Sequence, residues 1–299
     1  MEPTHDTVLQ TPNKSTNVRS FYQRAPRWIT GPFSAGSVVA PEATASLAAR
    51  LFFSTRRTAP KADQREVFEN GERFSVDGLS AWSWGKGPVV LLVHGWNGRA
   101  SQLAPFVSPL VSRGYQVVAF DAPGHGESPG RRSSLPEIAN AIRRVSDAVG
   151  PVYGVVAHSM GGAATTIALS EGLVVERAVF ISPPSNPEAF VTFFAQAIGI
   201  SDAVHARVRT KIETTVGRKL PALRADRLAP TMRAPLLVIH DEDDGHVPPQ
   251  SGQDIADAWP GATFVRTHGL GHQRILRDDY VNQLSVGFID ASRDERAAA

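Results

Sequence analysis

The sequence has 299 residues, of which 42% are hydrophobic and 20% are charged, with a formal net charge of +2. These values are typical of a globular protein with one large α/β domain or two smaller ones, and the small dispersed charge argues against a nucleic-acid partner. Because the chain has no cysteine, disulfides, thiolate metal ligands and a cysteine nucleophile are excluded. No apolar signal region opens the sequence and no run of about 18 apolar residues occurs, so we expect a cytoplasmic protein without a membrane span. The oligomeric state is left open.

The first 65 residues are expected to form a tail and an extension. Residues 1–20 are rich in Thr, Asn, Pro and Ser, which predicts a disordered tail. In the extension, residues 21–65, a helix is predicted over 41–55 with Leu47, Leu51 and Phe52 on one side. Because this apolar stripe is short, we favour a helix laid across the main domain. A basic amphipathic membrane-surface anchor over residues 41–57, ending at Arg56 and Arg57, is the alternative.

Strands and helices then alternate along the chain. Residues 66–85 predict a strand pair that turns at Asp77-Gly78, a strong hairpin signal. Further strands are predicted at 89–93, 115–120, 152–158, 178–181, 236–239 and 262–265, and helices at 102–113, 135–149, 163–169 and 280–289. This alternation predicts an α/β protein with a mostly parallel central sheet flanked by helices. We assign residues 66–185 and 233–292 to this core and residues 293–299 to a flexible C-terminus.

One segment, residues 186–232, breaks the alternation. It contains three helical stretches, at 187–198, 202–216 and 222–228, and no good strand. We interpret it as a helical cap over the carboxyl edge of the sheet, before the strand that leads to the acidic loop, because ligands of open α/β sheets bind at that edge. Phe190 and Phe194 give the first cap helix an apolar face. They are candidates for an acyl pocket, although packing against the core explains the same pattern.

The strand at 152–158 leads directly into Ser159, followed by Met160 and two glycines. Strand, sharp turn, serine, small residues and helix form the pattern of a nucleophile elbow. The hydroxyl of Ser159 would stand at the positive end of a helix, and the amide of Met160 would be free to donate to an oxyanion. The alternative without a catalytic role is a serine that only marks the start of a helix. His158, beside the nucleophile, is a further candidate for the substrate pocket.

A serine nucleophile requires a general base and an acid that orients the base. The strand at 236–239 leads into four consecutive acidic residues, 241–244, and the strand at 262–265 leads into a glycine-containing loop with two histidines. His272 is the predicted base and His268 the runner-up. The second oxyanion donor is expected in the loop after the strand at 89–93, where Gly95 allows close approach and Trp96 supplies the amide.

These motifs together resemble an α/β-hydrolase-fold serine hydrolase of the esterase/lipase type, over about residues 66–289. The stretches that carry the resemblance are 91–96 (LLVHGW), 121–128 (DAPGHGES), 157–162 (AHSMGG), 239–248 (IHDEDDGHVP) and 269–272 (GLGH). In that family the acid lies three residues before a Val-Pro pair, which selects Asp244, and the histidine of the 121–128 stretch, His125, is structural. The chain departs from the family pattern at Ala157 and at Asp241, where glycine is common.

The resemblance implies a cofactor-free serine carboxylic ester hydrolase that acts through Ser159, His272 and Asp244. It would form an acyl-enzyme with small to medium apolar acyl esters. The serine at the elbow argues against dehalogenases and epoxide hydrolases, which place Asp there. Same-fold C–C bond hydrolysis, lactone hydrolysis and perhydrolysis remain alternatives. A non-catalytic small-molecule-binding protein is the alternative from another class. The sequence shows neither metal-ligand spacing nor a dinucleotide fingerprint, so we expect no metal and no cofactor.

Overall fold

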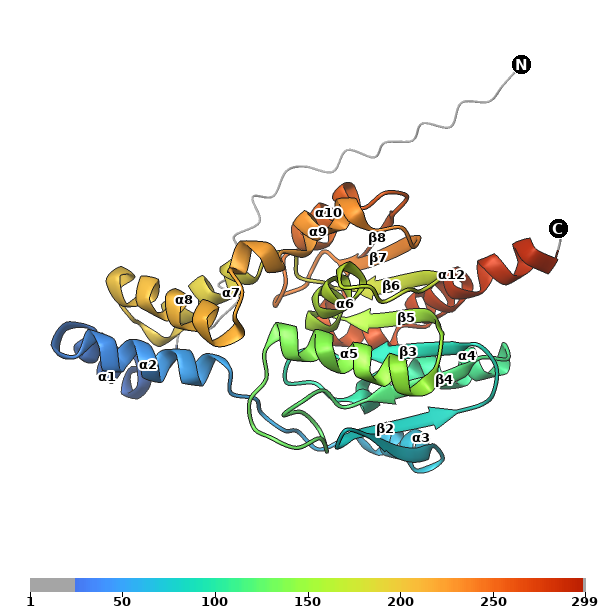
Figure 1. The fold of residues 1–299 in the computed structure, drawn as a ribbon, viewed down its shortest axis with the longest axis horizontal. Helices are drawn as coiled ribbons and strands as arrows, with labels where there is room; N and C mark the ends of the chain where they lie inside the picture. Colours follow the sequence, from blue (N-terminus) through green and yellow to red (C-terminus); the bar gives the residue numbers. More distant parts are fainter. Residues whose placement is uncertain (1–24, 298–299) are drawn as a thin grey trace, which may run out of the picture.

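The computed structural model describes residues 25–297, so the predicted tail at 1–20 and the last two residues lie outside it. Its centre is an eight-stranded sheet with strand order β1-β2-β4-β3-β5-β6-β7-β8. The pairs β1–β2 and β2–β4 are antiparallel and the other pairs are parallel, which confirms the predicted fold class (Figure 1). The strands are β1 (Glu72–Val76), β2 (Leu79–Trp84), β3 (Val89–Val93), β4 (Gln116–Phe120), β5 (Val152–His158), β6 (Arg177–Ile181), β7 (Leu236–Asp241) and β8 (Thr263–Thr267).

Helices cover both faces of this sheet. The helices and 3-10 turns are α1 (Arg27–Val39), α2 (Pro41–Phe52), α3 (Ala62–Glu69), η1 (Ala100–Phe106), α4 (Val107–Ser112), α5 (Leu135–Val149), α6 (Met160–Ser170), α7 (Pro187–Ile198), α8 (Asp202–Val216), η2 (Leu220–Leu223), α9 (Ala225–Leu228), η3 (Ala229–Thr231), α10 (Pro249–Ala258), α11 (Gly271–Arg274), η4 (Ile275–Arg277) and α12 (Asp279–Ala297). Successive residues of β3 alternate between two cores. Leu91 belongs to the core that contains residues of α5, α6 and α10, and Leu92 belongs to the core that contains residues of η1, α4 and α12. Both faces of β3 are therefore buried, which explains its uninterrupted apolar run.

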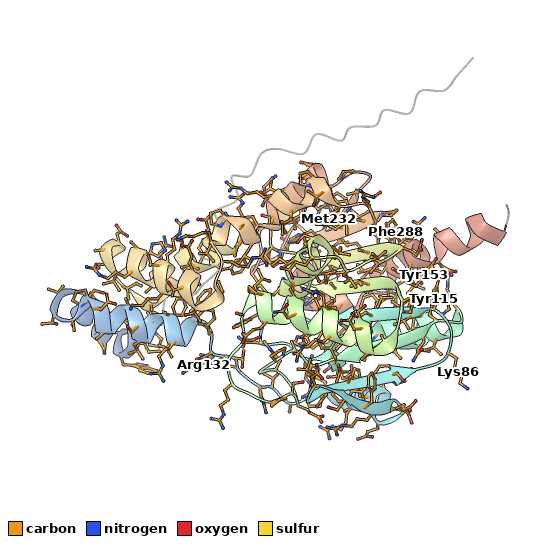
Figure 2. The ribbon with its side chains drawn as sticks, in the orientation of Figure 1. Lys86, Tyr115, Arg132, Tyr153, Met232 and Phe288 are labelled. Atoms are coloured by element: carbon orange, nitrogen blue, oxygen red, sulfur yellow. The ribbon has the colours of Figure 1, made fainter. Side chains whose placement is uncertain are left out.

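The second core also fixes the C-terminal helix. Tyr115 is fully buried, its hydroxyl donates to Asp290 of α12 over 2.9 Å, and its ring lies 5.5 Å from that of Tyr153 (Figure 2). Helix α12 continues to Ala297, beyond the predicted end at 289.

Two predicted elements differ from the structure. The single helix expected at 102–113 is a 3-10 turn, η1, followed by the short helix α4. Pro105 and Pro109 lack the amide hydrogens that a continuous α-helix needs. The predicted strand pair at 66–85 begins only at Glu72, because residues up to Glu69 belong to α3. Its hairpin turn is confirmed at Asp77-Gly78, where both residues have positive φ.

The cap is built from two distant segments of the chain. Helices α7 and α8, with η2 and α9, lie between β6 and β7 as expected. The favoured interpretation laid the helix predicted at 41–55 across the main domain, but α2 packs on the cap, and α1 precedes it. Both helices lie beside α7 and α8 (Figure 1). Ala45 and Ala48 of α2 are fully buried in this contact, because a small-residue face lets two helices approach closely. We call α1 and α2 together the N-terminal helix pair.

Candidate active site

The residue after β5 is Ser159, at the edge where the parallel strands end. It has φ +51° and ψ −125°, and α6 begins at the next residue. Positive φ is strained for a residue with a side chain, and here the amide of Ser159 is held by the Ile181 carbonyl at 2.8 Å. The strained turn lifts the side chain clear of both strand and helix. This is the local geometry of the predicted nucleophile elbow.

Ser159, His272 and Asp244 lie in one hydrogen-bonded row. The Nε2 atom of His272 lies 3.0 Å from Ser159 Oγ, and its Nδ1 atom lies 2.7 Å from Asp244 Oδ2. The other oxygen of Asp244 accepts the amides of His246 and Val247 at 2.8 and 2.9 Å. Burial raises the pKa of the Asp244 carboxyl, but hydrogen bonds from His240 and His272 outweigh burial and hold this pKa well below its usual range. An ionised Asp244 keeps the proton on Nδ1, which leaves Nε2 to face the serine.

His158 and His268, the other histidines predicted near the site, have no hydrogen bond to Ser159 or Asp244. His158 is not part of the cavity lining described below, which corrects the prediction that it is a pocket residue. It is buried, and its Nε2–H donates to the backbone carbonyl of His272 at 2.9 Å. Burial holds the pKa of His158 well below its usual value. Its neutral ring therefore helps to hold the His272 backbone in place through this hydrogen bond. His268 has a side chain that is 71% exposed, and it lies 3.3 Å from Glu242.

The loop after β3 packs directly on Ser159. A Cβ atom at Gly95 would lie 2.8 Å from Ser159 Cβ and 3.3 Å from its Oγ, so only glycine allows this approach. The amide of Trp96 follows at once, and the amide of Met160 lies at the first turn of α6, where amides have no intrahelical partner. His94 orders this loop. Its Nε2 accepts the Ala122 amide at 3.0 Å, which leaves the Nδ1–H to donate to the Gly95 carbonyl at 2.7 Å.

Asp241 is a site residue whose purpose the sequence did not indicate. Its carboxylate is fully buried at the end of β7. It accepts the amides of Asp243, Leu270 and Gly271 at 3.0, 3.1 and 2.8 Å, and the Thr267 hydroxyl at 2.7 Å. These donors come from the loop that carries Asp244 and from the loop that leads to His272. The side chain that replaces the family's usual glycine therefore ties the acid loop to the histidine loop.

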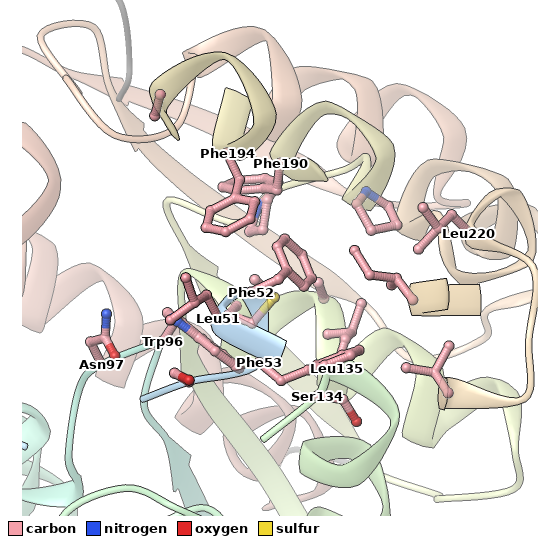
Figure 3. Close-up of a pocket in the computed structure, with 18 of the residues that line it drawn as sticks. Leu51, Phe52, Phe53, Trp96, Asn97, Ser134, Leu135, Phe190, Phe194 and Leu220 are labelled. Atoms are coloured by element: carbon pink, nitrogen blue, oxygen red, sulfur yellow. The ribbon is translucent and has the colours of Figure 1, made fainter. Parts of the chain in front are cut away.

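A cavity of about 660 Å³ opens on Ser159. Its lining is predominantly apolar and includes Phe190 and Phe194 of α7, as expected for the pocket candidates, and also residues of the N-terminal helix pair, which were not expected. Figure 3 shows Phe52 of α2 together with Phe190 and Phe194 at this cavity. The rings of Phe52 and Phe194 meet edge to face with centroids 5.5 Å apart. The apolar stripe of Leu51 and Phe52 was visible in the sequence, but its partner on α7 was not.

Within residues 25–291, the side chains of Asp244, His246 and His272 offer three metal-type donor atoms within 4.8 Å of one another. Two of these groups already share the 2.7 Å hydrogen bond described above. A metal ion at this place would have to displace that bond.

Comparison with known proteins identifies the family. The model of the alpha/beta hydrolase family matches residues 90–283, more than half of the chain, and the chain therefore belongs to this family. The predicted fold, family and enzyme class, a hydrolase, are confirmed. No described helix is long and apolar enough to cross a membrane.

Individual relatives agree with this assignment. A pimeloyl-[acyl-carrier protein] methyl ester esterase from Xanthomonas oryzae is 28% identical over 69% of this chain and 96% of its own length. Protein phosphatase methylesterase 1 from Bos taurus is 35% identical over 31% of this chain. The match spans only 26% of that methylesterase. Among solved structures, Est1E from Butyrivibrio proteoclasticus has a TM-score of 0.58 at 18% identity and covers 76% of this chain and 100% of its own.

Proposed function

We propose that this protein is a serine carboxylic ester hydrolase in which Ser159 is the nucleophile, His272 the general base and Asp244 the orienting acid. The observation that carries the proposal is the continuous row from Ser159 Oγ to His272 and Asp244, with separations of 3.0 and 2.7 Å. Ser159, at the end of this row, lines an apolar cavity. A positioned serine and base beside an acyl-sized cavity fit acyl transfer.

The reaction follows from this arrangement. Ser159 Oγ attacks the ester carbonyl while His272 Nε2 takes its proton, and ionised Asp244 stabilises the imidazolium that forms. The amides of Trp96 and Met160 hold the negative oxygen of the tetrahedral intermediate. The imidazolium then protonates the leaving alcohol and an acyl-enzyme remains. His272 next activates a water molecule, which releases the acid and restores the serine.

Two features support an ester with an apolar acyl group. The relatives that carry functional names include a pimeloyl-[acyl-carrier protein] methyl ester esterase and a methylesterase, and the cavity lining is mainly apolar. The polar residues Asn97 and Arg56 also belong to this lining.

The test is hydrolysis of p-nitrophenyl esters from acetate to hexadecanoate by the wild type and Ser159→Ala. We expect turnover that disappears in the variant, together with labelling of the wild type by a fluorophosphonate. His268→Gln is the control for His272→Gln, because the side chain of His268 is exposed and outside the row. A folded wild type that neither turns over any ester nor reacts with the fluorophosphonate would favour a small-molecule-binding protein. Labelling without ester turnover would favour C–C bond hydrolysis.

A further inference from the structure

The N-terminal helix pair precedes the segment that the family model matches, which begins at residue 90, yet it is packed as part of the cap. Glu42 of α2 forms ion pairs with Arg207 and Lys211 of α8. The amide of Ala25 donates to the Ala197 carbonyl at the end of α7 over 2.9 Å. The pair is thus attached to α8 by ion pairs and, through Ala25 just before α1, to α7 by a backbone hydrogen bond.

The two helices of the pair also hold each other in place. A Cβ atom at Gly36 would lie 2.5 Å from Thr44 Oγ1, so α1 and α2 cross in close contact. Phe33 of α1 is buried, with 8% of its surface exposed, and belongs to the same apolar core as Ala45 and Ala48 of α2. The pair therefore acts as one packed unit whose inner side is apolar.

That inner side forms a wall of the cavity above Ser159. Ile29 and Phe33 of α1 line the cavity, together with Leu51, Phe52 and the following Phe53. Cap residues such as Val191 lie in the same continuous core. The segment after α2 is attached to the predicted oxyanion loop, because the Arg56 amide donates to Asn97 Oδ1 at 2.7 Å. The wall and the reacting serine are thus parts of one site.

The cavity volume indicates the length of chain that this wall can accommodate. At about 30 Å³ per methylene-sized group, roughly the share that one water takes in the liquid, an acyl chain of about eleven carbons would occupy half of the 660 Å³ cavity. We infer that the N-terminal helix pair is the specificity-determining wall of the acyl site, and that the substrates are esters of medium-to-long acyl chains, of about ten to twelve carbons. This inference rests on the proposed ester hydrolase activity.

The test narrows the cavity at the wall and measures chain-length preference. Ile29→Trp and Leu51→Trp replace an aliphatic side chain by a larger indole ring at two lining positions. Leu47→Trp is the matched control, because Leu47 lies one turn before Leu51 on α2 and is similarly exposed, at 53% against 42%, but is not among the lining residues. Each enzyme is given an equimolar mixture of p-nitrophenyl acetate and dodecanoate, and the released acids are quantified by gas chromatography. The ratio of the two products gives the ratio of kcat/KM values and does not depend on the fraction of active enzyme.

We expect wild type to prefer the dodecanoate, and both lining variants to lower the dodecanoate-to-acetate ratio. Each introduced indole ring takes the space of about two methylene groups of the acyl chain. Each methylene group that is no longer buried lowers the kcat/KM for the dodecanoate about fourfold, so the dodecanoate-to-acetate ratio falls about 15-fold. Leu47→Trp keeps the wild-type ratio. Unchanged ratios in both folded lining variants, or an equal fall in the control, would overturn the inference. If the wild type showed no Ser159-dependent turnover of either ester, the proposed function would be refuted. This outcome differs from an unchanged product ratio, which would refute only the role of the wall.

Discussion

Replacement of Asp241 by Asn tests whether this buried carboxylate positions the histidine of the row. Asp241 accepts four hydrogen bonds, two on each oxygen, and none of its surface is exposed. Asn has almost the same shape but one of its head atoms is an NH₂ group, which can only donate. The substitution therefore sets a donor against donors without changing the volume of the site.

The magnitude follows from counting these bonds. If the NH₂ group takes the Oδ2 position, the Thr267 hydroxyl can turn to accept, but the Leu270 amide cannot. One buried amide without an acceptor costs about 1–3 kcal/mol, and the bonds that remain lose the strength that the charge gave them. We expect the free energy of unfolding to fall by about 3 kcal/mol. Since a shift of about 1 Å in a reacting group can cost about a hundredfold in rate, kcat should fall 10- to 100-fold.

Burial raises the pKa of Asp241, but the hydrogen bonds from Gly271, Thr267 and Leu270 outweigh burial and lower it overall. A carboxyl with a lowered pKa contributes its stability above its unfolded pKa of about 3.9 and loses it as the pH falls through the folded value. The full effect of Asp241→Asn is therefore present at pH 7, where both urea unfolding and steady-state kinetics are measured.

The matched control is Asp243→Asn, in the same loop. Asp243 Oδ2 accepts the Gly269 amide at 2.9 Å, but this bond is exposed, so water can replace what Asn cannot accept. We expect KM to change little in either variant, because the acyl cavity is built by other elements. An Asp241→Asn protein that is less stable but has the wild-type kcat would refute the positioning role and leave only a structural one.

Further predictions concern the loop after β3. Gly95→Ala adds a Cβ atom 2.8 Å from Ser159 Cβ, and we expect kcat to fall at least tenfold, checked against active-site titration with a fluorophosphonate. Asn97 has φ +55° and accepts the Arg56 amide. Asn97→Asp keeps both features and should retain the wild-type thermal midpoint. Asn97→Ala loses a side chain that tolerates positive φ, and its unfolding free energy should fall by about 1 kcal/mol, as measured in urea. The bond to the Arg56 amide is exposed, so water can replace it.

Much of the core and the reacting row could be predicted because their signals are local. Helix α7 begins and ends at the predicted residues, Pro187 and Ile198, since a proline at its first turn, an asparagine cap and a following glycine mark its ends. The strands that carry Ser159 and Asp244 are uninterrupted apolar runs. Ser159, Asp244 and His272 each follow a strand of the parallel part of the sheet, and the carboxyl ends of parallel strands lie at the same edge. The distances between their atoms came only from the structure.

The position of the N-terminal helix pair could not be predicted for the opposite reason. Ala45, Ala48 and Ala49 lie on one face of α2, which indicates close packing against some helix. Their partner, α8, begins at Asp202, and nothing in the local pattern identifies a partner so distant in sequence. The four hydrogen bonds of Asp241 were hidden in the same way, because three of the four donors lie on the loop from residue 267 to 271.

Buried histidines make a last prediction, on the stability of the fold below neutral pH. Burial lowers the pKa of both His94 and His125 to about 4, against about 6.5 in the unfolded chain. Between these values the unfolded state binds more protons than the folded state, so stability falls as the pH falls from 6.5 to 4. At pH 5 the two rings together cost about 4 kcal/mol relative to pH 7.5.

Urea unfolding at pH 7.5 and pH 5 measures this loss directly. His125→Gln should lessen the loss by about 2 kcal/mol, whereas His268→Gln, at an exposed side chain, should leave it unchanged. His158 and His246, whose pKa values are also lowered, add to the loss in the wild type. The lowered pKa values of Asp241 and Asp244 affect stability only below about pH 4, because a carboxyl loses its contribution only as the pH falls through its unfolded value of about 3.9 and below. If the wild type were equally stable at pH 7.5 and 5, or if His125→Gln lost as much stability as the wild type over that range, the buried rings would not be the groups that titrate.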